Sequence, residues 1–147
     1  MKDVDNRQLG RQGERIAREY ITNILGYRVI ESNYYASHKE IDIIASDGEY
    51  IVFIEVKCRT KGVREPKHRA GKAVGYKKRS NIIIAANTFI SEHYSDACVA
   101  GKQPRIDVIE VYVPPIDRRY SDSDNLKLCA CEINYIRNAF YSNCKTY

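Results

Sequence analysis

The sequence has no long apolar run, no secretory leader and no pattern of paired cysteines. Its longest unbroken apolar stretch is the five residues from Ile82 to Ala86, whereas a membrane-spanning helix needs about 20. The first residues, from Met1 to Asn6, lack the apolar stretch of a secretory signal. The five cysteines are odd in number and scattered, which argues against a disulfide framework. We therefore expect a cytoplasmic protein without a membrane partner, in a compartment that keeps thiols reduced.

The composition is that of an ordinary globular domain. The 147 residues are 44% apolar and 29% charged, which suits one domain with a sizeable core. The sequence shows no internal repeat and no linker long enough to separate two domains, so residues 1–147 are predicted to form one domain. Within it, we expect residues 116–125 to be a mobile loop and residues 126–147 to be a C-terminal addition.

Acidic residues are nearly missing from one stretch of the chain. Residues 57–79 contain ten of the 24 Lys and Arg residues but only one of the 19 acidic residues. The rest of the chain is net negative, so this stretch supplies all of the excess charge of +5. A polyanion is the natural partner, and nucleic acid is the commonest one. A solvated basic loop and an acidic protein partner are the alternatives.

Hydrophobic periodicity predicts an α/β fold, with helices against a mixed β-sheet. The predicted helices cover residues 6–25 and 72–94. The predicted strands cover residues 27–35, 40–46, 49–57 and 105–113. The order is therefore α-β-β-β-α-β, with a basic loop entered after the third strand. The C-terminal addition can supply a further strand over 126–136 and a short helix near 134–142.

Charged residues interrupt the two strands that flank the Asp-Gly pair at 47–48, a strong hairpin signal. Asp42 stands between two isoleucines, and Glu55 and Lys57 follow the apolar run 51–54. A buried charge is costly unless it is paired or binds a metal. A two-residue turn makes Glu55 the diagonal neighbour of Asp42, and a four-residue loop places it directly opposite. Either connection leaves Asp42, Glu55 and Lys57 on one face of the sheet.

Two carboxylates on one face are a usual Mg²⁺ or Mn²⁺ site, with waters and a substrate phosphate completing the coordination shell. Such a metal stabilises charge on the phosphate and lowers the pKa of an attacking water. Lys57 can orient that water or offset the developing charge. The structural alternative is an ion pair between Glu55 and Lys57, with Asp42 bound to backbone amides. The strand geometry by itself leaves both interpretations open.

These residues resemble the PD-(D/E)xK motif of nucleases, which include type II restriction enzymes and archaeal Holliday-junction resolvases. The aspartate is Asp42, and the E-x-K element reads Glu55-Val56-Lys57. Further segments extend the resemblance to the bacterial YraN-like family of small, uncharacterised endonuclease-related proteins, over most of the chain from Gln8 to Phe140. These segments are residues 13–17, 26–27, 33–34, 40–45, 52–59, 105–109 and 138–140.

The resemblance implies a restriction-endonuclease-like core and Mg²⁺-dependent hydrolysis of phosphodiester bonds in DNA, including branched or structured DNA. Asp42 and Glu55 would bind the metal, Lys57 would assist the water, and Glu14 on the first helix would add to the site, as in the resolvase branch. Glu14 falls at the edge of the buried helical stripe, where a solvated glutamate is equally ordinary. Resolvases act as two-fold dimers, which leaves a homodimer open. The alternative function is a non-catalytic nucleic-acid-binding module that keeps the nuclease fold.

Basic residues near the end of the E-x-K strand are candidates for contacts with nucleic-acid phosphates, a solvated helix face being the alternative. They are Arg59, Lys72, Lys77, Lys78 and Arg79. Three tyrosines offer rings that can stack on unpaired bases, although packing in the core or at its rim is the commoner role. They are Tyr34, Tyr35 and Tyr76.

Overall fold

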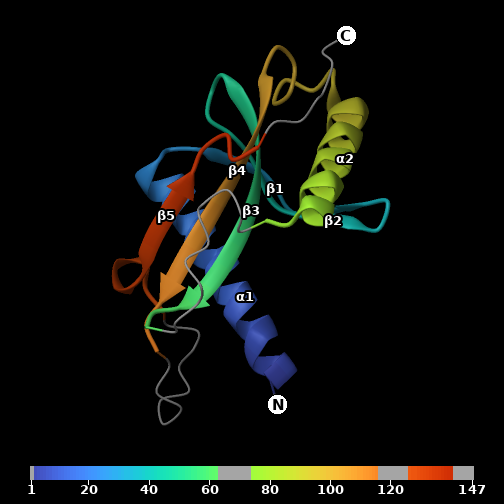
Figure 1. Cartoon of the computed structure of the whole chain (residues 1–147). Helices are drawn as coiled ribbons and strands as arrows, with labels where there is room; N and C mark the ends of the chain where they lie inside the picture. The colour runs from blue at the N-terminus through green and yellow to red at the C-terminus, as the bar shows by residue number, and fades with distance from the viewer. Residues whose placement is uncertain (1, 63–73, 116–125, 141–147) are drawn as a thin grey trace.

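The chain builds a five-stranded mixed sheet with a long helix against each face (Figure 1). The computed structural model describes residues 2–62, 74–115 and 126–140. The strands follow one another in the sheet in chain order, from β1 to β5. Strands β3 and β4 run parallel, and the other neighbouring pairs are antiparallel. The predicted α/β class is confirmed, and the arrangement is consistent with a restriction-endonuclease-like core.

The two helices and four strands of the predicted α-β-β-β-α-β order are present, with ends shifted by a few residues. The helices are α1 (Lys2–Glu19), which continues into a π-helical turn (Tyr20–Ile24), and α2 (Tyr76–His93). The strands are β1 (Arg28–Ala36), β2 (Lys39–Ser46), β3 (Tyr50–Thr60), β4 (Gln103–Val113) and β5 (Glu132–Ile136). A 3₁₀ turn (Leu128–Ala130) precedes β5.

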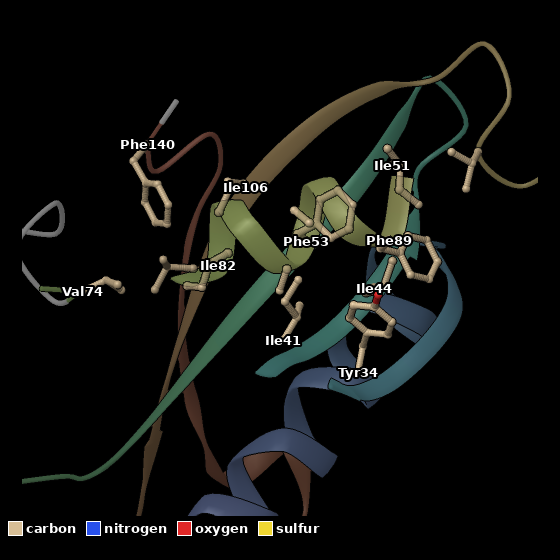
Figure 2. Close-up of a cluster of buried hydrophobic side chains, with 14 residues drawn as sticks. Tyr34, Ile41, Ile44, Ile51, Phe53, Val74, Ile82, Phe89, Ile106 and Phe140 are labelled. Carbon is tan, nitrogen blue, oxygen red and sulfur yellow. The ribbon is translucent and has the colours of Figure 1, made fainter. Parts of the chain in front are cut away.

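Helix α2 is the crossover that two parallel strands require, and it connects β3 to β4. It packs Ile82 and Phe89 against the face of the sheet that carries Phe53, as Figure 2 shows. Helix α1 covers the opposite face, where Ile16 packs in a second cluster with Val52. We call these two surfaces of the sheet the α2 face and the α1 face.

Strand β3 lies in the middle of the sheet and is buried on both faces. Phe53 belongs to the cluster on the α2 face, whereas Val52 and Ile54 belong to the cluster on the α1 face. Successive side chains of a strand point to opposite faces. Glu55 and Lys57 therefore continue the row of Phe53 on the α2 face, which is the shared face that the sequence predicts.

The connection between β2 and β3 is the four-residue loop, the second of the two connections that the sequence leaves open. Ser46 pairs with Ile51. The reason lies in Asp47, whose Oδ1 accepts a hydrogen bond from the Tyr50 backbone N–H at 2.9 Å. Its other oxygen, Oδ2, lies 2.7 Å from the Arg105 guanidinium. A contact with a distant strand thus fixes the loop, and the local Asp-Gly signal does not contain that information.

Two further boundaries differ from the sequence prediction. Strand β3 continues to Thr60 because it pairs with β4 over its whole length, so the basic loop begins later than expected. The described part of 134–142 contains no helix, since β5 runs to Ile136. Asn138 then adopts a φ of 51°, which ends any helical path. Its backbone N–H donates to Asp107 Oδ1 at 2.8 Å.

Several predictions fall on residues outside the described ranges. They are the loop 116–125, the phosphate contact of Lys72 and the last part of the C-terminal addition, 141–147. The described part of that addition supplies β5, which pairs antiparallel with β4. Among the helices that the structure describes, none has the length and apolarity needed to cross a membrane.

Candidate active site

The site lies where β2 and β3 separate. The two strands pair from Ser46 and Ile51 as far as Ile43 and Ile54, and their described pairing goes no further. Asp42, which precedes Ile43 in β2, is not paired with β3 through its backbone. Its side-chain Oδ2 instead accepts a hydrogen bond from the Val56 backbone N–H at 2.8 Å. A side-chain oxygen therefore takes the place of a backbone acceptor. The two strands diverge here (Figure 1).

Glu55 is a buried anion with an incomplete set of partners. The residue is 3% exposed, and its Oε1 lies 3.0 Å from Lys57 Nζ. Its Oε2 lies 3.4 Å from Lys78 Nζ, which is close enough for an ion pair. The contact lacks hydrogen-bond geometry, so Oε2 is buried without a hydrogen bond. A buried carboxylate oxygen without a donor is costly, and a cation in coordination distance would remove that cost.

Asp42 shares the site with other carboxylates. Burial and the nearby charge of Glu55 raise the pKa of Asp42 to about 7, and Glu14 adds to the rise. The Val56 N–H and the Lys78 ammonium act in the opposite direction and lower that pKa. Like charges gathered in a poorly solvated place favour either a bound proton or a bound cation. The arrangement therefore suits a divalent cation that compensates several negative charges at once.

Glu14 reaches the edge of this group from α1. The preceding residue, Gly13, is in such close contact with β3 that an added Cβ would lie 2.5 Å from Cys58 Cβ. This close approach brings Glu14 within electrostatic range of Glu55 and Glu40. Burial is the main cause of its raised pKa, and those two carboxylates raise it further, whereas Arg18 lowers it. The structure thus brings Glu14 within electrostatic range of Asp42 and Glu55, and its role in binding a metal stays a prediction.

The donor set fits a hard cation with two protein ligands. Within residues 2–62, 74–115 and 126–140, no group of three or more His, Cys, Asp or Glu side chains is close enough to hold a metal. Asp42 and Glu55 are therefore the two candidate ligands that remain, since Glu14 does not form a group of three with them. Mg²⁺ is usually bound through one or two carboxylates, while waters and substrate phosphates complete its octahedron. Asp42 and Glu55 supply carboxylate oxygens, the donor type that Mg²⁺ prefers, and one of these, Glu55 Oε2, has no hydrogen bond.

The basic residues that the sequence predicts as phosphate contacts have different surroundings in the structure. Lys78 points into the site and pairs with Glu55, whereas Lys77 is exposed one residue earlier. Arg79 is used within the fold, because its Nε donates to the Val74 carbonyl at 2.8 Å and its guanidinium stacks on Phe140 at 5.4 Å. Arg59 lies on β3 opposite Tyr112 of β4. The start of α2 therefore contributes one lysine to the site and presents a second to solvent.

The structural alternative for these residues also has support. Its two contacts are both present, namely the pair between Glu55 and Lys57 and the bond from Val56 to Asp42. They leave two features unexplained. A structural ion pair does not require a second carboxylate nearby whose pKa is raised to about 7. It also does not account for the buried oxygen of Glu55 that has no hydrogen bond.

Glu110 is a buried carboxylate that the sequence argument missed. It is 5% exposed and lies beside Lys57 in the parallel pairing of β3 and β4. Its Oε2 accepts hydrogen bonds from Tyr112 at 3.1 Å and from Asn134 Nδ2 at 2.9 Å. The signal was available, because Glu110 stands between Ile109 and Val111 as Asp42 stands between isoleucines. Its closeness to Lys57 depended on a strand register that the sequence did not provide.

A second buried ionic group lies elsewhere and is fully satisfied. Arg105 binds Asp47 at 2.7 Å and Asp107 at 3.0 Å, and donates to the Tyr27 hydroxyl at 3.0 Å. Asp107 is fully buried and also accepts hydrogen bonds from the Tyr135 hydroxyl and a backbone N–H. Every charge here has its partners, so this group ties strands together and offers no open position for a ligand.

Comparison with known proteins gives a consistent set of similar chains. A family model described as uncharacterised protein family UPF0102 matches residues 13–111. A UPF0102 protein of Caldanaerobacter subterraneus subsp. tengcongensis is 35% identical over 95% of this chain and 100% of its own length. UPF0102 proteins of Chlorobium limicola and Clostridium kluyveri are each 39% identical, over 78% and 84% of this chain and 83% and 91% of their own lengths. The matched segment contains the whole site described above, from Glu14 to Glu110.

Proposed function

This chain belongs to the uncharacterised protein family UPF0102, and from the geometry of its site we propose that it hydrolyses phosphodiester bonds in DNA with Mg²⁺ or Mn²⁺ as cofactor. One observation carries the proposal. The buried Oε2 of Glu55 has no hydrogen bond, and Glu55 lies close enough to Asp42 to raise the pKa of that carboxyl. The resemblance to PD-(D/E)xK nucleases favours branched or structured DNA as substrate. Under this proposal the binding partner of the protein is nucleic acid and the protein acts in the cytoplasm.

Each side chain of the site has a separate role in the proposed hydrolysis. Asp42 and Glu55 would hold the cation, which when bound stabilises charge on the phosphate and lowers the pKa of a water. Lys57, 3.0 Å from Glu55 Oε1, would orient the attacking water. Lys78 can offset the charge that develops on the phosphate oxygens. The water gives up a proton to solvent as its oxygen bonds to phosphorus, the P–O bond to the leaving sugar oxygen breaks, and that oxygen takes a proton from solvent.

Cleavage of a labelled panel of DNA tests the proposal. The panel contains single strand, duplex, flap and four-way junction, each incubated with Mg²⁺, with Mn²⁺ and with EDTA. The wild type should cut at least one substrate only when metal is present. Asp42→Ala and Lys57→Ala should each lower the rate by roughly 100-fold or more, because each removes a group that acts on the reacting phosphate.

A matched control separates this effect from general damage. Asp96→Ala removes an exposed carboxylate that pairs only with His93 at the surface, so it should cut like the wild type. Far-ultraviolet circular dichroism should show that all variants keep the fold. Cleavage by Asp42→Ala at the wild-type rate would sink the nuclease proposal.

The second candidate function is a nucleic-acid-binding module without catalysis. The observation in its favour is that two lysines already neutralise Glu55 without a metal. Titration calorimetry with Mg²⁺ and Mn²⁺ separates the two candidates. A nuclease should bind the cation through Asp42 and Glu55, and Asp42→Asn should lose that binding. A binding module should take up no cation, while binding DNA with an affinity that falls as salt rises.

A further inference from the structure

The first residue of α2 presents a bare aromatic ring to solvent. Tyr76 is 90% exposed, and no hydrogen bond or ring contact joins it to any other described residue. The other tyrosines behave differently. Tyr34 is buried, packs on Phe89 and donates to Glu92 at 2.9 Å, and Tyr35 contacts His38 at the hairpin end of β1. Packing therefore explains Tyr34, but it does not explain Tyr76.

Tyr76 stands at the same helix end that reaches the candidate active site. Lys78 lies two residues further along α2, and its Nζ is 3.4 Å from the unsatisfied Oε2 of Glu55. At about 1.5 Å of rise per residue, Tyr76 and Lys78 are about 3 Å apart along the helix axis, and being two residues apart they project to different sides of the helix. The exposed Lys77 lies between them in the chain. An exposed ring, an exposed ammonium group and the lysine that pairs with the buried Glu55 thus occupy three consecutive positions at the start of α2.

We propose that Tyr76 is a base-stacking subsite and that the preferred substrate has unpaired nucleotides next to the scissile phosphate. The inference rests on the proposed function, because it names the substrate class of the same site. Lysines contact phosphates without regard to strand number, whereas a ring can stack only on a base face that is free. In a duplex those faces are covered by neighbouring bases, so the ring distinguishes single-stranded segments, flaps and junction strands from intact duplex.

The chain offers a matched control at the other end of the same helix. Tyr94 follows α2 and is 72% exposed, nearly as much as Tyr76. It lies about 27 Å away along the axis, with Glu92 and Asp96 as charged neighbours in the chain. Acidic neighbours disfavour a polyanion. Exposure alone therefore does not make a stacking site, and Tyr76, unlike Tyr94, combines exposure with positively charged chain neighbours at the helix end that contributes Lys78 to the site.

Binding measured in EDTA tests this without any need for catalysis. Fluorescence anisotropy follows a labelled single strand, a flap and a blunt duplex of equal length with the full chain. Tyr76→Ala should weaken binding of the single strand and the flap by roughly tenfold, as expected for loss of one stacked base, and should change duplex binding by less than about twofold. Tyr76→Phe should bind like the wild type because it keeps the ring, and Tyr94→Ala should also be unchanged.

The outcomes separate this inference from the proposed function. Equal affinity of Tyr76→Ala and wild type for all three ligands would overturn the stacking subsite, as would an equal loss on duplex and single strand. The same comparison in an Asp42→Asn background, which cannot cleave under the proposal, should give the same selective loss. If no substrate is cut but the selective loss remains, the nuclease proposal fails and the subsite stands. If cutting occurs and Tyr76→Ala cuts and binds like the wild type, the subsite alone fails.

Discussion

Asp42 is the residue at which function and stability oppose each other. Burial and Glu55 raise its pKa from 3.8 to about 7. Between these two values the folded chain holds a proton that the unfolded chain has released, so folding is favoured as the pH falls through this range. Above pH 7 the residue is ionised in both states, and the folded state carries the full cost of the buried charge. A role in binding a metal ion would account for a buried carboxylate at position 42 that lowers the stability of the fold.

Asp42→Asn should therefore stabilise the fold at alkaline pH. The amide oxygen can still accept the Val56 N–H bond, while the charge is gone. We expect a gain of at most on the order of 4 kcal/mol at pH 8, since one pKa unit corresponds to about 1.4 kcal/mol. The gain should shrink as the pH falls from about 7 toward the ordinary carboxyl range.

Urea unfolding of both proteins from pH 5 to pH 8 measures this difference. Asp96→Asn, at an exposed pair, serves as the control and should show no comparable change with pH. Added Mg²⁺ should reduce the difference in free energy of unfolding between wild type and Asp42→Asn at pH 8, because the ion binds only the folded wild type. A difference in free energy of unfolding between wild type and Asp42→Asn that stays constant from pH 5 to pH 8 would contradict the prediction.

The contact between α1 and β3 is the feature that matters most at the scale of single elements. Gly13 has no room for a side chain, because its Cβ would lie 2.5 Å from Cys58 Cβ and 2.9 Å from Cys58 Sγ. The same helix contains Gly10, where nothing lies within 4 Å of an added Cβ. The two glycines therefore test packing and helix propensity separately within one helix.

Gly13→Ala should destabilise the protein by about 1–3 kcal/mol, as expected for an overpacked contact. Gly10→Ala should leave stability unchanged or raise it by up to about 1 kcal/mol, because alanine is the better helix former. Denaturant unfolding of the two variants measures both effects. By displacing α1, Gly13→Ala should also move Glu14 and lower the metal-dependent activity. Equal effects of the two substitutions would contradict this account of the contact.

The β2–β3 connection shows what local sequence can and cannot predict about an element. The alternation of apolar residues located both strands, because burial of one or both faces follows directly from side-chain spacing. The Asp-Gly pair predicted a hairpin between them but left the length of its loop open, and the structure has the four-residue loop. In that loop Asp47 binds Arg105, 58 positions later in the chain. A loop held by such a distant partner cannot be inferred from the four residues that form it.

Across the whole molecule, Arg105 and Asp107 connect four parts of the chain. Arg105 contacts Asp47 in the β2–β3 loop and Tyr27 just before β1. Asp107 accepts hydrogen bonds from Tyr135 of β5. The sheet is thus tied together by a single ionic group whose members make none of the contacts of the candidate site. Buried pairs of this kind are strongly destabilising when one partner is removed, since an uncompensated charge remains.

Asp107→Ala should lower the free energy of unfolding by about 3–5 kcal/mol, a large part of the roughly 5–15 kcal/mol that a domain possesses. The exposed pair of His93 and Asp96, at 2.7 Å, provides the comparison. Asp96→Ala should cost less than about 1 kcal/mol, because solvent screens that pair. Urea unfolding at one pH measures both. A loss in Asp107→Ala no larger than in Asp96→Ala would show that the buried network does not hold the sheet together.

The sequence by itself determined the helices and strands, and it placed Glu55 and Lys57 on one face, because hydrophobic period and side-chain alternation are local properties of the chain. Only the tertiary structure decided that β2 leaves β3 at Asp42, that Lys78 arrives from α2, and that Glu110 lies beside Lys57. These outcomes depend on strand register and on how closely each helix packs against the sheet. Both are set by contacts between residues far apart in sequence, and the resulting burial gives the carboxylates their chemistry.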